Sequence, residues 1–179
     1  LDGAVAIFCS VGGVEPQSET VWRQADKYRI PRIAFINKMD RTGADFQGCL
    51  HMMVDRLKTN PLPLQLPIGK EEDFEGIVDL ISMKAILYDP HSLGTEFNIL
   101  DIPEAYLEEA HKQREILIAR LAEWDERLME KYIEGKEISE LELKQSVRNV
   151  TLQLRGTPVL CGASFRNKGV QPLLDAIID

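Results

Sequence analysis

Residues 32–40 read Arg32-Ile33-Ala34-Phe35-Ile36-Asn37-Lys38-Met39-Asp40, an apolar run that ends in polar side chains. The apolar part does not alternate with polar residues, which is typical of a strand covered on both faces of a parallel sheet. The runs Ala4–Cys9 and Thr157–Cys161 have the same character. A helical pattern over about 16–28 separates the first two runs, so they form a strand–helix–strand unit. We therefore predict an α/β fold with a doubly wound parallel sheet.

The connection between the second and third apolar runs is too long for a single crossover. Successive strands of a doubly wound sheet need roughly 25–30 residues between them. The interval from Met39 to Thr157 is several times longer, although a helix over about 44–58 fills its first part. Over 62–68 apolar residues alternate with prolines, which indicates an edge strand or an extended lead-in. We expect residues 1–61 and 156–179 to form one unit and residues 62–155 an inserted α+β subdomain.

The inserted segment carries its own helix and strand patterns. Short apolar runs predict strands over 76–80 and 84–88. A long helix is expected to open at Pro103 and to reach about residue 122, with Leu107, Ala110, Leu117 and Leu121 on one face. A shorter helix should end near residue 134. Ser139, with Glu142 three residues later, predicts a capping box for a further helix to about residue 153.

The composition excludes several classes of function. The 179 residues carry a net charge of −8, and no basic patch of the kind that grips nucleic acid is evident. An odd number of cysteines without a C-x-x-C pair argues against disulfides, and the histidines are too scattered for a metal site. These residues are Cys9, Cys49, Cys161, His51, His91 and His111. No membrane span or signal peptide is recognisable, so we expect a cytoplasmic protein.

The residues Asn37-Lys38-Met39-Asp40 follow a predicted strand, at the edge where open α/β sheets bind ligands. The Asp40 carboxylate can accept two parallel hydrogen bonds, from N1–H and from the 2-amino group of guanine. Adenine lacks both donors, and each charged hydrogen bond is worth roughly 1.5–3 kcal/mol. Asn37 can tie neighbouring loops together, and the stem of Lys38 can cover one face of the base. The simpler alternative is a solvated polar turn.

A second loop follows the third predicted strand and reads Gly162-Ala163-Ser164-Phe165-Arg166-Asn167-Lys168-Gly169. Small residues let backbone N–H groups approach a ligand closely, here the guanine O6. By itself this is an ordinary strand-to-helix loop, but together the two loops predict a guanine pocket. The candidate guanine-binding residues are Asn37, Lys38, Met39, Asp40, Ala163, Ser164 and Phe165. No catalytic residue and no metal ligand is expected.

Four stretches give the chain its resemblance to bacterial elongation factor G, a translational GTPase. They are residues 11–17 (VGGVEPQ), 37–45 (NKMDRTGAD), 76–80 (GIVDL) and 167–171 (NKGVQ). The resemblance implies GTP or GDP as ligand, Mg²⁺ in the parent protein and a role in ribosomal translocation. It also implies that the inserted subdomain contacts the ribosomal stalk protein, and we expect the helix over 103–122 to carry that surface. The alternative function is therefore a stalk-binding module without nucleotide chemistry.

One position departs from the pattern of this family. The family usually reads Gly-Ser-Ala in the second loop, whereas this chain has Gly162-Ala163-Ser164. The resemblance implies that the N–H facing guanine O6 belongs to Ser164 and survives the exchange. The hydroxyl at the preceding position is lost, and with it the bracing of the loop that we would expect from it.

The sequence contains no phosphate-binding G-x-x-x-x-G-K-[ST] motif. Two D-x-x-G matches, at Asp40 and Asp73, do not follow a phosphate loop, and we interpret both as coincidences. Without those elements phosphoryl transfer lacks positioning and charge stabilisation. In the family they lie upstream of the position of Leu1. We therefore expect an excised piece of a GTPase, an incomplete doubly wound P-loop sheet that hydrolyses nothing by itself. An ordinary flavodoxin-like domain is the least favoured alternative.

The resemblance also implies which strand lies at the edge of the sheet. The strand over residues 4–9 would normally pair with a strand that this chain lacks, and it holds no charge or proline that would blunt an edge. We expect the chain to self-associate by pairing two such edges antiparallel. The remaining expected partners are a guanine nucleotide and the ribosome, without a membrane and without a direct grip on nucleic acid.

Overall fold

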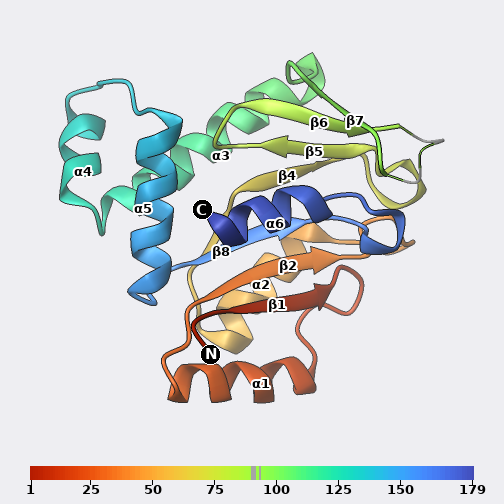
Figure 1. Cartoon of the computed structure of the whole chain (residues 1–179), viewed down its shortest axis with the longest axis horizontal. Coiled ribbons are helices and arrows are strands. Elements are labelled where there is room, and N and C mark those ends of the chain that lie inside the picture. The colour runs from red at the N-terminus through yellow and green to blue at the C-terminus, as the bar shows by residue number, and fades with distance from the viewer. Residues whose placement is uncertain (90–91, 93) are drawn as a thin grey trace.

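The computed structural model describes residues 1–89, 92 and 94–179, so His91 lies outside the described residues. The chain forms two four-stranded sheets, one parallel and one antiparallel, with helices around both (Figure 1). The predicted α/β class is confirmed. Among the described residues, no helix is long and apolar enough to cross a membrane.

The parallel sheet has the strand order β1-β2-β8-β3. Its strands are β1 (Ala4–Cys9), β2 (Arg32–Asn37), β8 (Thr157–Cys161) and β3 (Pro61–Pro63). The register places Cys9 beside Asn37 and Ile36 beside Cys161, so three strands end at the same edge. The three strands predicted from apolar runs are confirmed, but the expectation that β1 is covered on both faces was wrong, because Val5 and Ile7 are exposed at the edge of the sheet.

Three helices flank the parallel sheet: α1 (Pro16–Lys27), α2 (Phe46–Leu57) and α6 (Val170–Ile178). Pro16 opens α1, where a fixed φ suits the first helical turn. The Asp45 carboxylate caps α2 by accepting a hydrogen bond from the Gly48 N–H at 2.9 Å. In Figure 1, α6 lies in front of the sheet and α2 behind it. Trp22 of α1 and Phe8 of β1 pack with ring centroids 6.0 Å apart.

The antiparallel sheet is a simple meander of β4 (Gln65–Ile68), β5 (Gly76–Asp79), β6 (Lys84–Tyr88) and β7 (Phe97–Leu100). The strands β5 and β6 were predicted. The sequence analysis missed β7, whose four residues are all exposed and therefore show no alternation between core and solvent. β7 is held by pairing with β6, in which Ile86 faces Ile99.

The helices of the inserted segment are α3 (Glu104–Ala122), α4 (Glu126–Ile133) and α5 (Glu140–Leu152). Ala110, Leu117 and Leu121 are buried, whereas Leu107, on the same predicted face, is 40% exposed. Arg114, further along α3, donates to the carbonyl oxygens of Leu80 and Ile81.

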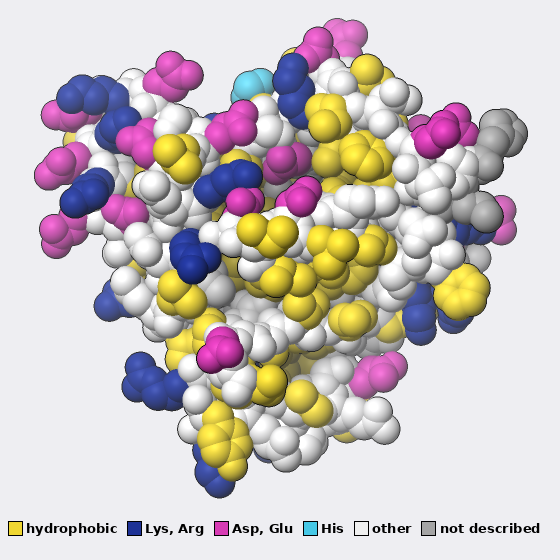
Figure 2. Space-filling view, in the orientation of Figure 1, with side chains coloured by type: hydrophobic (Ala, Val, Ile, Leu, Met, Phe, Trp, Pro, Cys, Tyr) yellow, Lys and Arg dark blue, Asp and Glu magenta, His cyan; other side chains and the backbone are white. Residues whose placement is uncertain are grey.

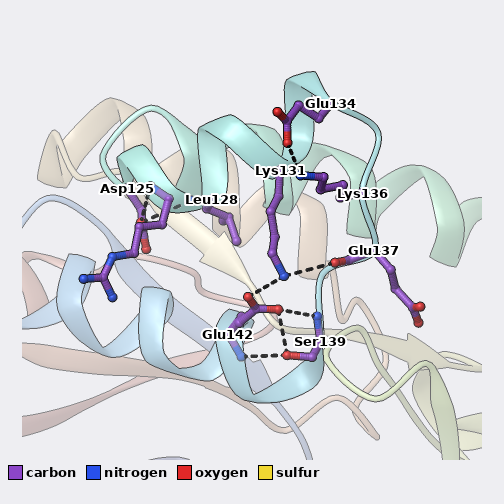
Figure 3. A network of polar contacts seen from close by, with 9 residues as sticks. Asp125, Leu128, Lys131, Glu134, Lys136, Glu137, Ser139 and Glu142 are labelled. Carbon is purple, nitrogen blue, oxygen red and sulfur yellow. Dashed lines mark hydrogen bonds and ion pairs between the residues drawn. The ribbon is translucent and has the colours of Figure 1, made fainter.

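A polar network joins α4 to the beginning of α5 (Figure 3). The predicted capping box is confirmed: the Ser139 hydroxyl accepts from the Glu142 N–H, and the Glu142 carboxylate accepts from the Ser139 N–H at 3.0 Å. The same carboxylate lies 2.6 Å from the Lys131 ammonium. Hydrogen bonds from Lys131 and Ser139 lower the pKa of Glu142 to about 2.

The two sheets are joined through one short stretch. β3 spans the expected boundary between residues 61 and 62 and lies at the edge of the parallel sheet. Just after β3, the Leu64 N–H donates to the Val159 carbonyl of β8, at 2.9 Å. The Leu64 carbonyl accepts from the Leu80 N–H after β5, also at 2.9 Å. Leu64, between β3 and β4, is thus hydrogen-bonded to both sheets, and the proline-rich stretch provides an edge strand to each.

Candidate functional site

The predicted site residues come from two loops at the carboxyl edge of the parallel sheet. We call them the β2 loop (residues 38–45) and the β8 loop (residues 162–169). Because β2 and β8 are neighbours in the sheet, both loops leave it side by side. The Met39 N–H donates to the Gly162 carbonyl at 3.0 Å, which joins the loops where they start.

Asn37 and Ser164 make a reciprocal pair of hydrogen bonds between the two loops. The Asn37 Nδ2 donates to the Ser164 Oγ at 2.8 Å, and the Ser164 N–H donates to the Asn37 Oδ1 at 2.9 Å. The expectation that Asn37 ties neighbouring loops together agrees with this geometry. An amide side chain suits the position because it offers a donor and an acceptor in one plane.

The exchange at Ala163 and Ser164 leaves a hydroxyl in the β8 loop, one residue further along the chain. The Ser164 Oγ accepts from the Asn37 side chain and so joins this loop to β2. The Ser164 N–H is engaged by Asn37, so its role as the donor to guanine O6 stays a prediction.

Asp40 lies between the two loops with its carboxylate mostly shielded. Its side chain is 17% exposed, and Oδ2 lies 3.1 Å from Nε of Arg166 in the β8 loop. The ion pair holds the carboxylate at the mouth of the site, since the Arg166 side chain remains 53% exposed. Arg166 was noted in the loop sequence but was assigned no role. A basic residue in a loop that neighbours Asp40 was the signal from which this ion pair could have been predicted.

Lys38 has a left-handed backbone, with φ 66°. Its N–H donates to the Asn37 Oδ1 at 2.8 Å, and its carbonyl accepts from the Ser10 Oγ at 2.7 Å. Ser10 is buried and follows β1 at the same edge of the sheet. The sequence analysis missed Ser10, although a small polar residue directly after an apolar strand was the signal that could have found it.

The remaining predicted residues contribute differently. The side chains of Met39 and Ala163 are buried, so these two residues can offer a ligand only their backbone groups. The Phe165 side chain is fully exposed and is free to contact a ligand from solvent. It lies in the short 3₁₀ helix η2 (Ser164–Arg166). Of the seven predicted residues, the structure joins Asn37, Ser164 and Lys38 by hydrogen bonds, with Asp40 beside them.

The inserted segment supports the β8 loop from behind. The Gly169 N–H donates to the Tyr88 Oη of β6 at 2.8 Å. Burial raises the pKa of the Tyr88 hydroxyl to about 12, so the group stays neutral. The Lys168 Nζ donates to the Phe74 carbonyl at 2.6 Å. Burial, followed by the charge of Arg166, lowers the pKa of Lys168.

A cavity of about 810 Å³ lies away from this edge. It lies at the amino ends of the parallel strands, between them, α6 and the antiparallel sheet, and is lined by residues such as Val5, Ile33, Leu160 and Ile99. Figure 2 shows a central group of hydrophobic side chains on this face of the molecule. Its walls are mainly apolar, with charged residues such as Asp79, Lys144 and Asp179 among them. Nowhere among the described residues do three His, Cys, Asp or Glu side chains cluster as metal ligands would.

Two comparisons place the chain among known proteins. Residues 1–179 match the family described as the elongation factor Tu GTP binding domain. A crystal structure from Thermus thermophilus superposes with a TM-score of 0.86 at 27% sequence identity. The match covers 99% of this chain and 26% of the Thermus chain, so the present chain spans about a quarter of that protein's length.

Proposed function

The chain belongs to the family of elongation factor Tu GTP binding domains, and we propose that it is the guanine-recognising part of a translation elongation factor of the elongation factor G kind. The four stretches quoted above support this assignment within the family. The parent protein would hydrolyse GTP in the cytoplasm and promote ribosomal translocation. In this chain Asp40 would read the base, with Asn37, Lys38 and Ser164 holding its loop.

The observation that carries the proposal is the pairing of the two loops. The Asn37–Ser164 hydrogen bonds and the Asp40–Arg166 ion pair bring a carboxylate and a small-residue loop to one edge of the sheet. A carboxylate held there suits guanine, which offers two adjacent N–H donors. Adenine offers neither donor, and a site built to hydrogen-bond a ligand N–H rejects an analogue that lacks it more strongly than a missing methylene does.

For the chain by itself we propose weak guanine binding and no hydrolysis. The sequence has no G-x-x-x-x-G-K-[ST] motif to hold phosphates. The described residues also include no cluster of three or more His, Cys, Asp or Glu side chains that could hold a metal ion. The affinity must then come from the base and the sugar alone, without the electrostatic contacts that position a phosphoryl group.

Nuclear magnetic resonance titrations of the ¹⁵N-labelled chain with GDP and with ADP test the proposal. We expect GDP to shift the amide signals of the β2 and β8 loops at millimolar concentrations, and ADP to shift them less. Asp40→Ala should abolish the preference, while Asp55→Ala, an exposed carboxylate on α2, should not. Equal responses to GDP and ADP would refute guanine recognition. Sub-micromolar affinity or GTP turnover would refute the weak, non-hydrolytic behaviour.

The alternative function is binding of the ribosomal stalk protein through α3. The outward side of α3 is exposed at Glu108, His111, Lys112 and Glu115. Lys112→Glu should weaken binding of the stalk protein's C-terminal domain, whereas Lys136→Glu, after α4, should not. Arg120 is unsuitable as a second test position because it donates to the Pro61 carbonyl at 2.9 Å. Unchanged binding by Lys112→Glu would assign the contact to another face.

We also propose that the chain self-associates through β1. Of the described strands, only β2 pairs with β1, which leaves β1 at the edge of the sheet. Val5 and Ile7 on this strand are 37% and 62% exposed. Sedimentation velocity over a concentration series should show dimers that Ile7→Lys disperses. Val21→Lys, a similarly exposed position on α1, is the control, and a monomer at every concentration would refute the proposal.

A further inference from the structure

The inserted segment contains a tight turn that contacts both the β2 loop and the β8 loop. It spans residues 69–75, between β4 and β5, and includes the short 3₁₀ helix η1 (Glu71–Asp73). Gly69 has φ 74°, and a Cβ added there would lie 1.8 Å from the Asp73 carbonyl oxygen. Only glycine fits this close approach, so the turn has one available shape. We call it the brace turn.

Glu71 connects the brace turn to the β2 loop at two points. Its N–H donates to the Met39 carbonyl at 3.1 Å. Its carboxylate Oε1 accepts from the Gly43 N–H at 2.7 Å. The two contacts lie on either side of Asp40, so one residue holds both ends of the segment that carries the base-reading carboxylate.

The backbone of Glu71 is in an uncommon conformation. Its φ is 55°, in the left-handed region that residues with a side chain rarely occupy. Lys38, which precedes Met39, has φ 66°. Left-handed residues that are not glycine persist where surrounding contacts fix them, and they concentrate at functional sites. Here the fixed contact is the one between the brace turn and the β2 loop.

Other contacts hold the brace turn itself in place. The Phe74 ring is buried, and its N–H donates to the Glu71 carbonyl at 3.0 Å. The Phe74 carbonyl accepts from Lys168 of the β8 loop at 2.6 Å. On the other side, the Gly69 N–H donates to the Tyr106 Oη of α3 at 2.9 Å. Glu71 thus belongs to a turn that is held in place by hydrogen bonds to α3 and to the β8 loop.

We propose that Glu71 is a positioning residue for guanine recognition, which clamps the β2 loop so that Asp40 is held ready for the base. This inference rests on the proposed function. A loop fixed before binding loses less conformational freedom when the ligand arrives, and affinity rises accordingly. The inserted segment then contributes to base recognition through its own side chain, without touching the nucleotide.

Hydrogen exchange of the free chain tests the clamp without any ligand. We expect Glu71→Ala to accelerate exchange of the Gly43 amide about threefold to tenfold, because the substitution removes the hydrogen bond that this amide donates. Glu71→Gln keeps an acceptor oxygen and should largely restore protection. Glu72→Ala removes an exposed carboxylate one residue along the same turn and should leave the exchange unchanged. Unaltered Gly43 exchange in Glu71→Ala would overturn the clamp.

Titration with GDP and IDP tests the link to the base. IDP lacks the 2-amino group, so it makes only one of the two hydrogen bonds expected at Asp40. Glu71→Ala should lower GDP affinity about threefold to tenfold and IDP affinity less, with rescue by Glu71→Gln. Faster Gly43 exchange with an unchanged GDP-to-IDP ratio would overturn the positioning role. If the unaltered chain does not distinguish GDP from ADP, the proposed function fails, whatever the exchange data show.

Discussion

The two sheets of this chain use their residues in opposite ways. In the parallel sheet, polar side chains gather where the strands end, and Asn37, Asp40 and Ser164 meet within hydrogen-bonding distance of a neighbour. In the inserted segment, polar side chains such as Tyr88 and Glu71 instead accept hydrogen bonds from the loops of the parallel sheet. The second region thus supports the loops of the first. The inserted segment therefore serves as a scaffold for the loops as well as a surface.

The difference has a physical origin in strand direction. Parallel strands all end at one edge, so loops that are distant in sequence converge there and form a pocket. An antiparallel meander sends successive turns to opposite edges, and no such convergence arises. Chemistry should therefore be sensitive to changes in the loops of the parallel sheet, and stability to changes at the contact between the two regions.

The largest effect is expected at Asp40, the carboxylate of the first region. Asp40→Asn replaces an acceptor by an amide, which suits the 2-oxo group of xanthine better than the 2-amino group of guanine. We expect the preference for GDP over XDP to fall about tenfold to hundredfold, because the substitution removes about one charged hydrogen bond to guanine. Competitive titration with the two nucleotides measures the ratio. Asp55→Asn should not alter it, and an unchanged ratio in Asp40→Asn would remove Asp40 from the site.

Tyr88 tests the contact between the regions. Tyr88→Phe leaves the buried Gly169 N–H without its acceptor, which should cost about 1–3 kcal/mol of unfolding free energy. Urea unfolding monitored by circular dichroism measures the change. Tyr28 is 69% exposed on the surface after α1, and Tyr28→Phe provides the matched control. Equal stabilities of the two variants would show that the inserted segment does not support the β8 loop.

Arg120 tests the same contact at the other end of the molecule. Its guanidinium donates to the Pro61 carbonyl of β3 at 2.9 Å. Arg120→Ala should lower the unfolding free energy by about 0.5–1.5 kcal/mol, whereas Lys112→Ala on the same helix should leave it unaltered. Thermal unfolding of the pair measures the difference. If both variants melt together, α3 is not anchored to the parallel sheet through Arg120.

The smallest effect is expected within the inserted segment alone, at Glu142. Its pKa is lowered to about 2 from an ordinary 4.5. A carboxyl group with a depressed folded-state pKa stabilises the fold above its unfolded pKa, and loses this contribution as the pH falls from 4.5 toward 2. Glu142→Gln should therefore melt below the unaltered chain at pH 7 and together with it near pH 2. A gap that persists in acid would contradict the pairing with Lys131.

The fold prediction was most accurate for the buried strands, whose apolar runs are easily recognised in the sequence. The apolar runs at Ala4, Arg32 and Thr157 are strands because they are only 6, 6 and 5 residues long, too short for a typical helix, and they pair with one another in parallel. β7 was missed because all four of its residues are exposed, and pairing with β6 decides its conformation. The predicted site residues are those that lie at the end of a strand or directly after it. Glu71 could not be placed, because its contact with Gly43 depends on how a distant turn folds back.

The resemblance and the residues contributed different parts of the site prediction. The residues indicated a carboxylate aimed at guanine, whereas the resemblance supplied the expected role of the Ser164 N–H. Neither indicated that the Ser164 hydroxyl would accept from Asn37, because that depends on the direction of one side chain. Arg166 was in view but unassigned, since an arginine in an exposed loop has no preferred partner in sequence.

Leu64 has a practical meaning for anyone who wishes to exchange parts between related chains. Its N–H is fixed to one sheet and its carbonyl to the other, so a single peptide segment fastens the two layers together. A chimaera joined at this residue would combine main-chain partners from two parents in one place. A splice before β3 and after α5 would instead keep the bond between Leu64 and Leu80 within one parent, and would leave the backbone pairing of β3 with β8 to join the two parents. The inserted segment is thus exchangeable as a unit only when β3 travels with it.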